Sequence, residues 1–466
     1  MKRKALIFMA FSAAVLISCG GKDDPAPGPV VNGGGETPAA EKFEIGSVLP
    51  AWEEGYLDIH SINGSRGEAF YYILPDGTTM LIDAAGAPPN ELTDYGSSAA
   101  GVASKPSVNI SNGQVIVNYI KHFAPAVASG KLDYFVTSHY HGDHIGAWRN
   151  EYKTYNWYPI DKNGAQVSAV NINDGGFLLN GLPEVGMSIP ISKVFDRGDW
   201  NNPPSDEYST STSDGNYKRY QMYLNFLDYS KRKYGTVREA FKVGHTDQIV
   251  LLHDPAKYTS FKVRSVAAGG HVWTGSGTSE KTLFPSVEEC LKNQELYAIG
   301  ENHLSCVLLL QYGNFDMFTG GDVQYNGAST YSWKHVEKTI AAAMKKVEVM
   351  KASHHSTANT NSSELLSVLK PDVYIAGVWR TVQPNPETLK RVLAANANTK
   401  IFTTNLDATN VTTLKSNGID PATFGCTGGH VVVRVANGGK KYWVLVLDDS
   451  NEQYKVVKKV GPLACM

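Results

Sequence analysis

The feature that most constrains the fold is the segment 139–144, which reads His-Tyr-His-Gly-Asp-His. It places three imidazoles and one carboxylate within six residues, and these are ligand types that Zn²⁺ and similar divalent ions use in proteins. The segment directly follows the apolar run 132–137, which has the length of a buried strand. Open α/β sheets bind ligands at the carboxyl ends of their strands. The segment therefore predicts an α/β fold with a metal site at one edge of a sheet.

This one segment has ligands for two metal ions. His139 and His141 are two residues apart, so in an extended stretch both side chains can point to the same ion. Gly142 allows a tight turn, after which Asp143 and His144 can face a second ion. We expect two divalent ions here, and zinc in particular, because imidazole and carboxylate suit it.

Apolar alternation predicts further strands on both sides of the segment. Residues 57–62, 69–74 and 79–83 have strand patterns, with a turn at 75–77. Other strands are predicted at 248–253, 261–267, 305–311, 315–318, 347–351 and 373–377, and a final pair at 431–435 and 441–447 closes the chain. Helices are predicted at 115–122, 364–369 and 386–395. Strand groups separated by helices are typical of two sheets with helices outside them.

Residues 201–244 interrupt this alternation. They begin with a polar loop rich in Asn and Pro and continue as a Tyr-rich helix at about 217–234. We interpret this segment as a helical insertion into the α/β domain.

Several stretches, taken with the segment 139–144, resemble the metallo-β-lactamase superfamily and in particular its ComEC-like branch. They are residues 60–69, 74–77 and 81–84, although Asn63 and Glu68 stand where that branch has Asp. The resemblance implies a four-layer αβ/βα sandwich over residues 43–466. It also implies two ions at the edge between the two sheets.

The resemblance implies further ligands outside the segment. Asp322 ends a strand-turn-strand stretch in Gly-Asp and would bridge the two ions. His354 and His355 follow another apolar run, and one of them would bind the second ion. We favour His354 as that ligand. His355 would then line the pocket, contact a substrate oxygen or act as a general acid.

The third ligand of the first ion stays open between Asn302 and His303. Many superfamily members have a histidine just before a strand at this place, whereas the ComEC-like branch tends to have an Asn-x-x-Ser pattern, which residues 302–305 match. An amide oxygen would bind Zn²⁺ more weakly than an imidazole.

The expected reaction is hydrolysis by a hydroxide shared between two ions, with Asp143 and His355 as catalytic residues. The resemblance implies phosphoesters or phosphodiesters as substrates, and the superfamily also hydrolyses lactones and lactams. We therefore keep two alternatives open. One is a lactonase or β-lactamase, and the other is a non-catalytic surface-binding lipoprotein that retains the metal site. Trp148, Trp379 and the Tyr-rich helix are candidates for stacking on a substrate.

The first residues predict export and lipid anchoring. Three basic residues at 2–4 precede the apolar run 5–17, which suits a signal peptide and is too short for a membrane span. Cys19 follows this run in a sequence that resembles a bacterial lipobox, so residues 1–18 would be removed and Cys19 lipidated. Residues 19–42 then form a flexible Gly- and Pro-rich tether. We expect a lipid-anchored protein of the bacterial cell envelope, attached to the membrane by this anchor alone.

The charge of the chain bears on its partners. Residues 1–18 hold three of the 43 Lys and Arg and none of the 45 Asp and Glu, so the mature chain would carry a formal net charge of −5. This mild acidity disfavours nucleic acid as a partner and leaves a small molecule or an envelope polymer as the expected substrate. The four cysteines beyond Cys19 show no close pair of the kind that zinc ribbons or redox motifs require.

Overall fold

The computed structural model describes residues 37–466 except 65, 87–92, 95–96, 101, 103–104, 294–298 and 326–331. The predicted signal peptide, Cys19 and most of the tether lie outside the described residues. Residues 39–466 form one unit, and the account below concerns that unit alone. Among the described residues, no helix is both long and apolar enough to cross a membrane.

The first of two large sheets has nine strands. In spatial order they are β10 (Val237–Ala240), β9 (Ile191–Asp196), β6 (Leu132–Val136), β3 (Thr79–Ile82), β2 (Phe70–Ile73), β1 (Leu57–Ser61), β19 (His430–Val435), β20 (Lys441–Leu447) and β21 (Val456–Ala464). The four strands from β10 to β3 are parallel, and the remaining pairings are antiparallel.

The second large sheet has eight strands. Their order is β13 (Glu280–Thr282), β12 (His271–Trp273), β11 (Phe261–Ala268), β14 (Val307–Tyr312), β15 (Phe315–Thr319), β16 (Val349–Lys351), β17 (Val373–Ala376) and β18 (Lys400–Thr403). The four strands from β15 to β18 are parallel. Two small hairpins, β4 (Thr93–Asp94) with β5 (Ser97–Ala100) and β7 (Tyr158–Ile160) with β8 (Phe177–Leu179), lie outside these sheets.

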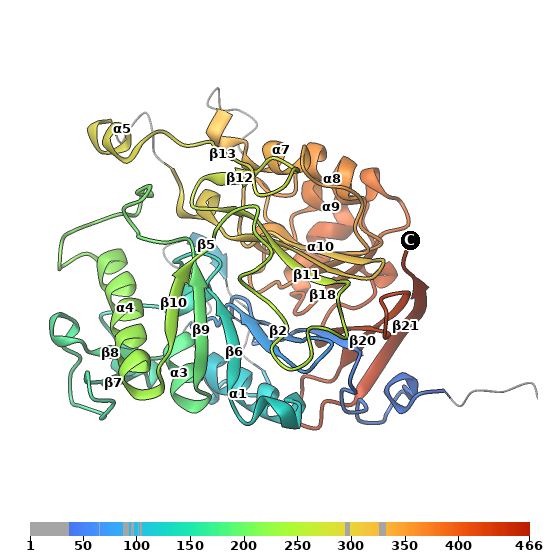
Figure 1. The fold of residues 1–466 in the computed structure, drawn as a ribbon, viewed down its shortest axis with the longest axis horizontal. Helices are drawn as coiled ribbons and strands as arrows, with labels where there is room; N and C mark the ends of the chain where they lie inside the picture. Colours follow the sequence, from blue (N-terminus) through green and yellow to red (C-terminus); the bar gives the residue numbers. More distant parts are fainter. Residues whose placement is uncertain are drawn as a thin grey trace, which may run out of the picture. The chain divides into compact units, whose positions relative to one another are not determined.

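Three hydrophobic cores stack the elements into four layers (Figure 1). Strand β2 shows why: Phe70 and Tyr72 point into the core between the sheets, whereas Tyr71 and Ile73 point into the core under the helices. Both faces of the central strands are thus buried, as their apolar sequences require.

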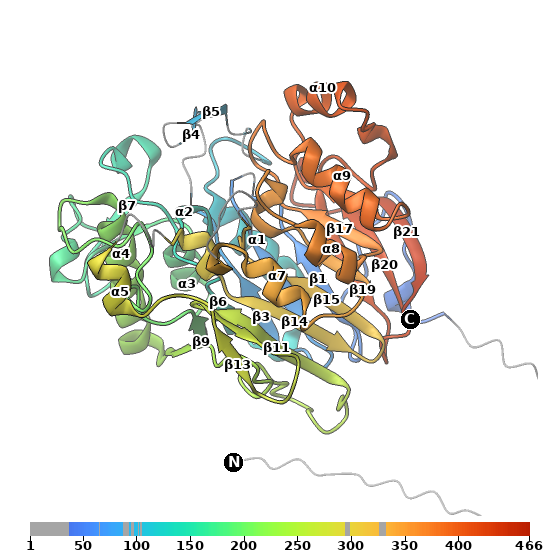
Figure 2. The ribbon, with the colours of Figure 1, turned by 90° about the horizontal axis from the view of Figure 1, so that it is seen from above.

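The helices form the two outer layers. The first sheet is covered by α1 (Asn112–Phe123), α3 (Leu182–Ser188) and α4 (Gly215–Tyr234), and the second by α7 (Val336–Ala341), α8 (Ser363–Leu369), α9 (Pro386–Ala395) and α10 (Ala408–Ser416). Short helices α2 (Gly142–Ile145) and α5 (Val287–Lys292) complete the set that the structure describes. Figure 2 shows α7, α8 and α9 side by side over β15 and β17. The predicted αβ/βα sandwich is confirmed.

The segment predicted as an insertion is part of the outer layer and the sheet edge. Helix α4 begins after Asp214, whose side chain accepts hydrogen bonds from the backbone of residues 216 and 217, and ends at Gly235 in the left-handed region. It connects β9 to β10, which pair in parallel, so residues 201–244 extend the first sheet by one strand.

Two expectations about strands are wrong. Residues 248–253 form no strand, although Ile249 and Leu251 are buried in the core between the sheets. Backbone groups of this segment bond to side chains instead of to another strand. For example, Leu252 N donates a hydrogen bond to Thr78 Oγ1 at 2.8 Å. The pair β19 and β20 does not close the chain, because β21 follows at the sheet edge, with mostly exposed residues that hide the apolar alternation.

Candidate metal centre

The carboxyl ends of parallel strands from both sheets carry the candidate ligands. The segment 139–144 follows β6, and Asp322 follows β15. The histidine pair at 354–355 follows β16. Because β6 belongs to the first sheet and β15 and β16 to the second, the centre lies where the two sheet edges meet.

The carboxylate of Asp322 is the common neighbour of four histidines. Its Oδ2 lies 3.1 Å from His144 Nε2, 3.5 Å from His355 Nε2, 3.7 Å from His354 Nε2 and 3.8 Å from His139 Nε2. Donor atoms of four histidines from two distant segments thus converge on one buried oxygen.

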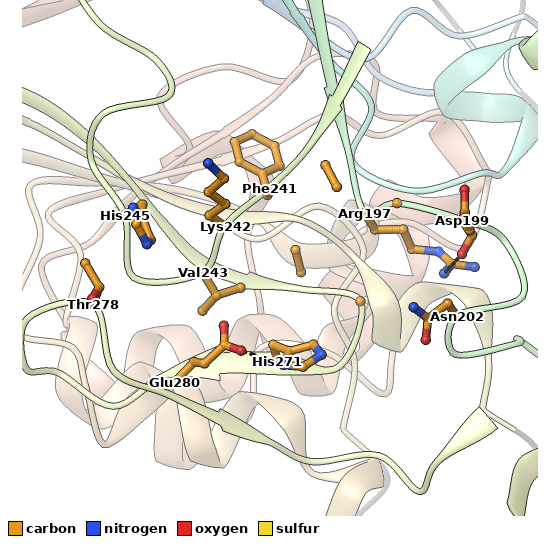
Figure 3. A pocket seen from close by; sticks show the side chains of 14 residues that line it. Arg197, Asp199, Asn202, Phe241, Lys242, Val243, His245, His271, Thr278 and Glu280 are labelled. Carbon is orange, nitrogen blue, oxygen red and sulfur yellow. Dashed lines mark hydrogen bonds and ion pairs between the residues drawn. The ribbon is translucent and has the colours of Figure 1, made fainter. Parts of the chain in front are cut away.

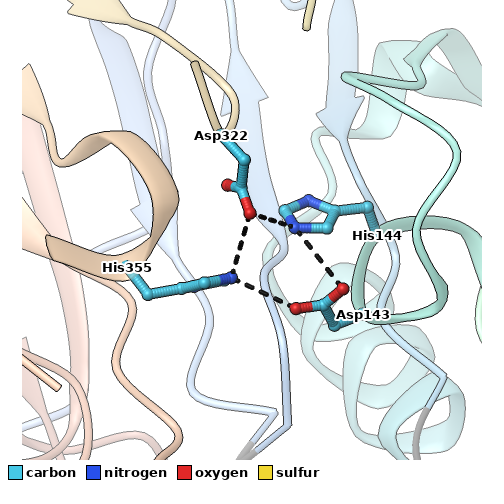
Figure 4. Close-up of side chains that lie close together, drawn as sticks. All are labelled: Asp143, His144, Asp322 and His355. Atoms are coloured by element: carbon cyan, nitrogen blue, oxygen red, sulfur yellow. Dashed lines mark hydrogen bonds and ion pairs between the residues drawn. The ribbon is translucent and has the colours of Figure 1, made fainter. Parts of the chain in front are cut away.

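Four of these side chains form a closed arrangement in which carboxylates and imidazoles alternate (Figure 4). Asp143 Oδ2 lies 3.3 Å from His355 Nε2, and Asp143 Oδ1 lies 3.8 Å from His144 Nε2. One ligand atom each from Asp143, His144, Asp322 and His355 falls within 4.8 Å of all the others. Two carboxylates and two imidazoles at this spacing fit a divalent ion.

A second pair of donors, His139 and His141, is connected to Asp322 through His139 Nε2, which lies 3.8 Å from Asp322 Oδ2. His139 Nε2 and His141 Nδ1 are 2.9 Å apart. Two donors that share a tetrahedral zinc ion lie ~3.3 Å apart, so both nitrogens can face one ion. His141 is less enclosed than His139, with 21% of its side chain exposed.

The nitrogens that face away from the centre are held by neighbours. His144 Nδ1 lies 2.8 Å from Asp83 Oδ2, which also accepts a hydrogen bond from Ser138 Oγ at 2.6 Å. Ser138 Oγ in turn lies 3.0 Å from His139 Nδ1. With protons on these Nδ1 atoms, Nε2 of both rings is left as a metal donor.

A second carboxylate holds His141. Its Nε2 lies 2.7 Å from Glu207 Oε1, and Arg219 donates to Glu207 Oε2 at 2.5 Å. Arg219 Nε also donates to the Tyr140 carbonyl at 2.7 Å. Glu207 comes from the loop before α4 and Arg219 from α4 itself, so the segment 201–244 supports the centre.

A buried ion pair holds His355. Its Nδ1 lies 2.8 Å from the Gly377 carbonyl and 3.2 Å from Glu68 Oε1. Glu68 Oε2 pairs with Lys351 Nζ at 2.6 Å, and Lys351 also donates to the Gly321 carbonyl at 2.7 Å. The Gly377 contact fixes the proton on Nδ1 and frees Nε2.

Charges in the centre are matched before any cation binds. Burial alone would raise the pKa of Asp322, but His144, His355 and His354 hold it well below its usual value, and His144 and His355 do the same for Asp143. Burial would lower the pKa of His355, but Asp322 and Glu68 raise it to about 9. A divalent ion would displace these imidazolium protons, so binding should weaken as the pH falls.

Buried atoms without a partner test whether the residues fit a metal. Within the described residues, His355 Nε2 and Asp322 Oδ1 are buried and form no hydrogen bond, and the same holds for Asn302 Oδ1. Such atoms normally have a partner, and a divalent ion provides one for nitrogen and oxygen alike. The residues present therefore fit a metal centre.

The backbone after β16 is unusual. His354, His355 and Ser356 have φ values of 46°, 53° and 64°, so three consecutive residues are left-handed. This costs free energy for any residue with a side chain and persists where the surrounding structure requires it. It allows two adjacent rings to enter the same site, whereas neighbours in an extended chain point apart.

The candidate ligands predicted from the sequence lie close together, and the histidine pair is arranged differently from our expectation. His139, His141, Asp143, His144 and Asp322 all converge, as does the pair. The tight cluster contains His355, which we had expected to be the pocket-lining residue, and His354 lies beside it. Because both nitrogens of His355 already face fixed groups, the geometry favours a ligand role over a general acid.

Of the two candidates for the third ligand of the first ion, only Asn302 lies beside the cluster. Asn302 Nδ2 is 3.5 Å from the His354 ring. The pKa of His303 is lowered to about 4 by burial and by its neighbours Lys334 and His335, which are not part of the centre. No ring nitrogen of His303 bonds within the described residues.

Several supporting residues were missed. Asp83 and Glu68 occur in the stretches that resemble the ComEC-like branch, but nothing in those stretches indicates contact with His144 or His355. Glu207 lies in a polar loop without any motif. The only signal in the sequence was the position of two of these acids: Glu68 follows a glycine, and Asp83 ends a predicted strand.

The aromatic residues that we expected to stack on a substrate pack mainly against other side chains of the protein. Trp379 is only 1% exposed, with its ring centroid 6.1 Å from that of His355. Tyr220 and Tyr223 of α4 pack against Tyr140. Trp148 is half-buried, with Lys218 Nζ 5.0 Å from its ring centroid.

A polar cavity of about 590 Å³ lies apart from the centre (Figure 3). It is lined by His245, His271 and Glu280, among others, and none of the candidate ligands lines it. Its wall includes Arg197, which donates two hydrogen bonds of 2.9 Å to Glu301. Because Glu301 also accepts from Tyr140 N at 3.2 Å, this buried pair links the cavity wall to the metal-binding segment.

The sequence matches no protein-family model and no curated protein. Among solved structures, the metallo-β-lactamase fold protein YhfI of Bacillus subtilis shares 10% identity at a TM-score of 0.31, covering 75% of this chain and 96% of that one. Zn²⁺-bound PqqB of Methylobacterium extorquens shares 9% at 0.31, covering 75% and 97%. The diiron β-hydroxylase CmlA of Streptomyces venezuelae shares 12% at 0.33, covering 83% and 55%. Similarity of this degree transfers no activity, so function is argued from the site.

Proposed function

We propose that this protein is a metal-dependent hydrolase with two divalent ions, zinc in the first instance. The observation that carries the proposal is the convergence of four histidine nitrogens within 3.8 Å of Asp322 Oδ2. In the proposal Asp322 lies between the ions. His139 and His141 face one ion, and Asp143, His144 and His355 face the other.

When bound, the two ions would lower the pKa of a shared water and stabilise negative charge on the substrate. The residues that surround them differ in access. Side chains of His139, His144, His355 and Asp322 are at most 1% exposed, whereas Asp143, His141 and His354 are 15–21% exposed. Substrate would therefore approach from the side of the exposed three. Asp143 is the accessible carboxylate that can orient a water and accept its proton.

Phosphoesters or phosphodiesters of envelope or extracellular molecules are the proposed substrates. Support comes from the sequence resemblance to the ComEC-like branch and from the predicted lipid anchor. The mild negative charge of the mature chain disfavours nucleic acid.

A substrate panel tests the proposal on the mature chain loaded with zinc. We expect turnover of bis-p-nitrophenyl phosphate or p-nitrophenyl phosphorylcholine, and loss of that turnover in Asp143→Asn. Asp133→Asn is a matched control, because Asp133 is also a buried carboxylate but bonds only to Thr79 in the described structure. Hydrolysis of nitrocefin or acyl-homoserine lactones instead would favour a lactonase or β-lactamase. Metal binding without turnover of any substrate would favour the non-catalytic alternative.

The cell envelope is the proposed location, with Cys19 as the lipidated residue. The support is the basic, apolar and Cys-containing sequence of residues 1–19. Fractionation of cells that express the full chain should place the protein with membranes, and Cys19→Ser should release it. Equal distribution of the two forms would contradict the anchor.

A further inference from the structure

The pair His139 and His141 lacks a third protein nitrogen at the places where the sequence suggested one. With Asp322 these two residues supply three donors, while a structural or catalytic zinc site commonly has three or four protein ligands. His303 has its charged neighbours outside the centre. Asn302 offers only an amide, which is a weak zinc ligand.

His354 is a candidate for a third nitrogen donor. Its Nε2 lies 3.7 Å from Asp322 Oδ2, almost the same as the 3.8 Å from His139 Nε2 to that atom. Its side chain is 21% exposed, as is that of His141, whereas His355 is 1% exposed. His354 and His141 are thus the two more exposed histidines of the centre.

The two adjacent histidines face different neighbours. His355 Nε2 lies 3.3 Å from Asp143, which belongs to the second ion. The His354 ring contacts the Asn302 amide at 3.5 Å and has Gln324 and Thr357 at its Nδ1, at 2.5 and 3.0 Å. The left-handed turn makes this division possible, because it brings both rings to Asp322 from adjacent backbone positions.

We propose that His354 and His355 bind different ions: His355 the second, with Asp143 and His144, and His354 the first, with His139 and His141. This inference rests on the two-ion centre of the proposed function. It assigns His354 Nε2 as the donor that completes the first ion's ligand set, in place of Asn302 or His303.

The assignment fixes the protons around His354. Coordination through Nε2 places the ring proton on Nδ1, where Thr357 Oγ1 can accept it. The Gln324 amide must then present its oxygen to Nδ1, because the amide orientation follows from its hydrogen-bond partners. Thr357 and Gln324 would serve His354 as Asp83 serves His144.

The experiment measures bound zinc in the mature chain after dialysis, together with the visible spectrum of the Co²⁺-substituted protein. The test variant is His354→Asn, because Asn tolerates the left-handed backbone and is too short to reach the ion. Asn302→Ala tests the competing ligand, and His303→Ala is a matched control. Circular dichroism and thermal unfolding show whether each variant is folded, and His354→Ala provides a second change at the same position.

We expect two equivalents of zinc in the wild type and in His303→Ala, and one in folded His354→Asn and His354→Ala, with a changed Co²⁺ spectrum. Two equivalents and an unchanged spectrum in both His354 variants would overturn the inference and leave the proposed function intact. Loss of an ion in Asn302→Ala but not in the His354 variants would also overturn it. A wild type without metal would overturn the proposed function itself, and the inference with it.

Discussion

Replacement of Asp83 by Asn should weaken binding of the second ion without unfolding the protein. Asp83 has a φ of 63°, a conformation that Asn adopts at least as readily as Asp. Its carboxylate accepts hydrogen bonds from Ser138 N at 2.8 Å and Ser138 Oγ at 2.6 Å, and lies 2.8 Å from His144 Nδ1. An amide has one acceptor oxygen, so its NH₂ group must replace either Oδ1, where it faces Ser138 N, or Oδ2, where it faces both Ser138 Oγ and His144 Nδ1. Facing His144, it favours a proton on Nε2, where the metal should bind.

The size of the effect follows from the bond that is lost. A hydrogen bond to a charged group contributes about 1.5–3 kcal/mol. Loss of such a support to a ligating histidine weakens metal binding roughly 10- to 100-fold. We therefore expect the dissociation constant of the second ion to rise by that factor in Asp83→Asn.

Competition with a chromophoric zinc chelator measures this constant for each ion. Asp133→Asn is the control, since Asp133 accepts from Thr79 N and Oγ1 at the other end of the same strands, about 13 Å away along β3. The control should lose stability and keep its metal affinity. A folded Asp83→Asn protein that binds both ions within threefold of the wild type would refute the assigned role of Asp83.

Three further results are expected. Glu207→Gln should weaken the first ion by roughly tenfold in the same titration, since an amide orients His141 less firmly; unchanged affinity would mean that Glu207 only braces its loop. Burial raises the pKa of Glu184 to about 7, so the contribution of this residue to the free energy of unfolding is full below about pH 4.5 and is lost as the pH rises through 7. Urea unfolding should therefore show that Glu184→Gln gains up to about 3 kcal/mol of stability relative to the wild type between pH 5 and 8. Parallel pH profiles of the two proteins would contradict this. Leu366→Ala opens a cavity in the core under α8, so urea unfolding should show that it lowers the free energy of unfolding by about 2–5 kcal/mol. The zinc content of the folded protein should stay unchanged. A lower zinc content would show coupling between that core and the centre.

Several strands with both faces buried were predictable, although β9 and β18, which are also largely buried, were not predicted. Strands such as β2 and β14 are continuous apolar runs between turns, and their positions were found within one or two residues. Residues 248–253 carry a similar apolar pattern, but the decisive partners Thr78 and Asp76 are side chains far away in the sequence. β21 was missed for the opposite reason, because an edge strand with exposed residues has little pattern to detect.

The convergence of the candidate ligands was predictable as far as these residues follow strand ends. His139, His144 and Asp322 follow this rule, and their convergence depends only on strand ends meeting at one edge. The roles within the histidine pair depend on backbone handedness, which residue type does not determine for His354 and His355. The roles of the supporting carboxylates depend on contacts with residues far away in the sequence, so no local motif reveals these roles.

At the left-handed turn of residues 354–356, selection for stability and selection for metal-dependent activity should favour different residues. Glycine at any of these positions would relieve a backbone cost of about 1 kcal/mol, and at Ser356 it would give up only the hydrogen bond from Tyr374 at 2.9 Å. A library screened for abundance should therefore enrich glycine and asparagine at 354 and 355, while a library screened for metal-dependent turnover should retain both histidines. Opposite preferences at adjacent positions would identify, from sequence counts alone, the residues that the chain keeps for chemistry at the expense of stability.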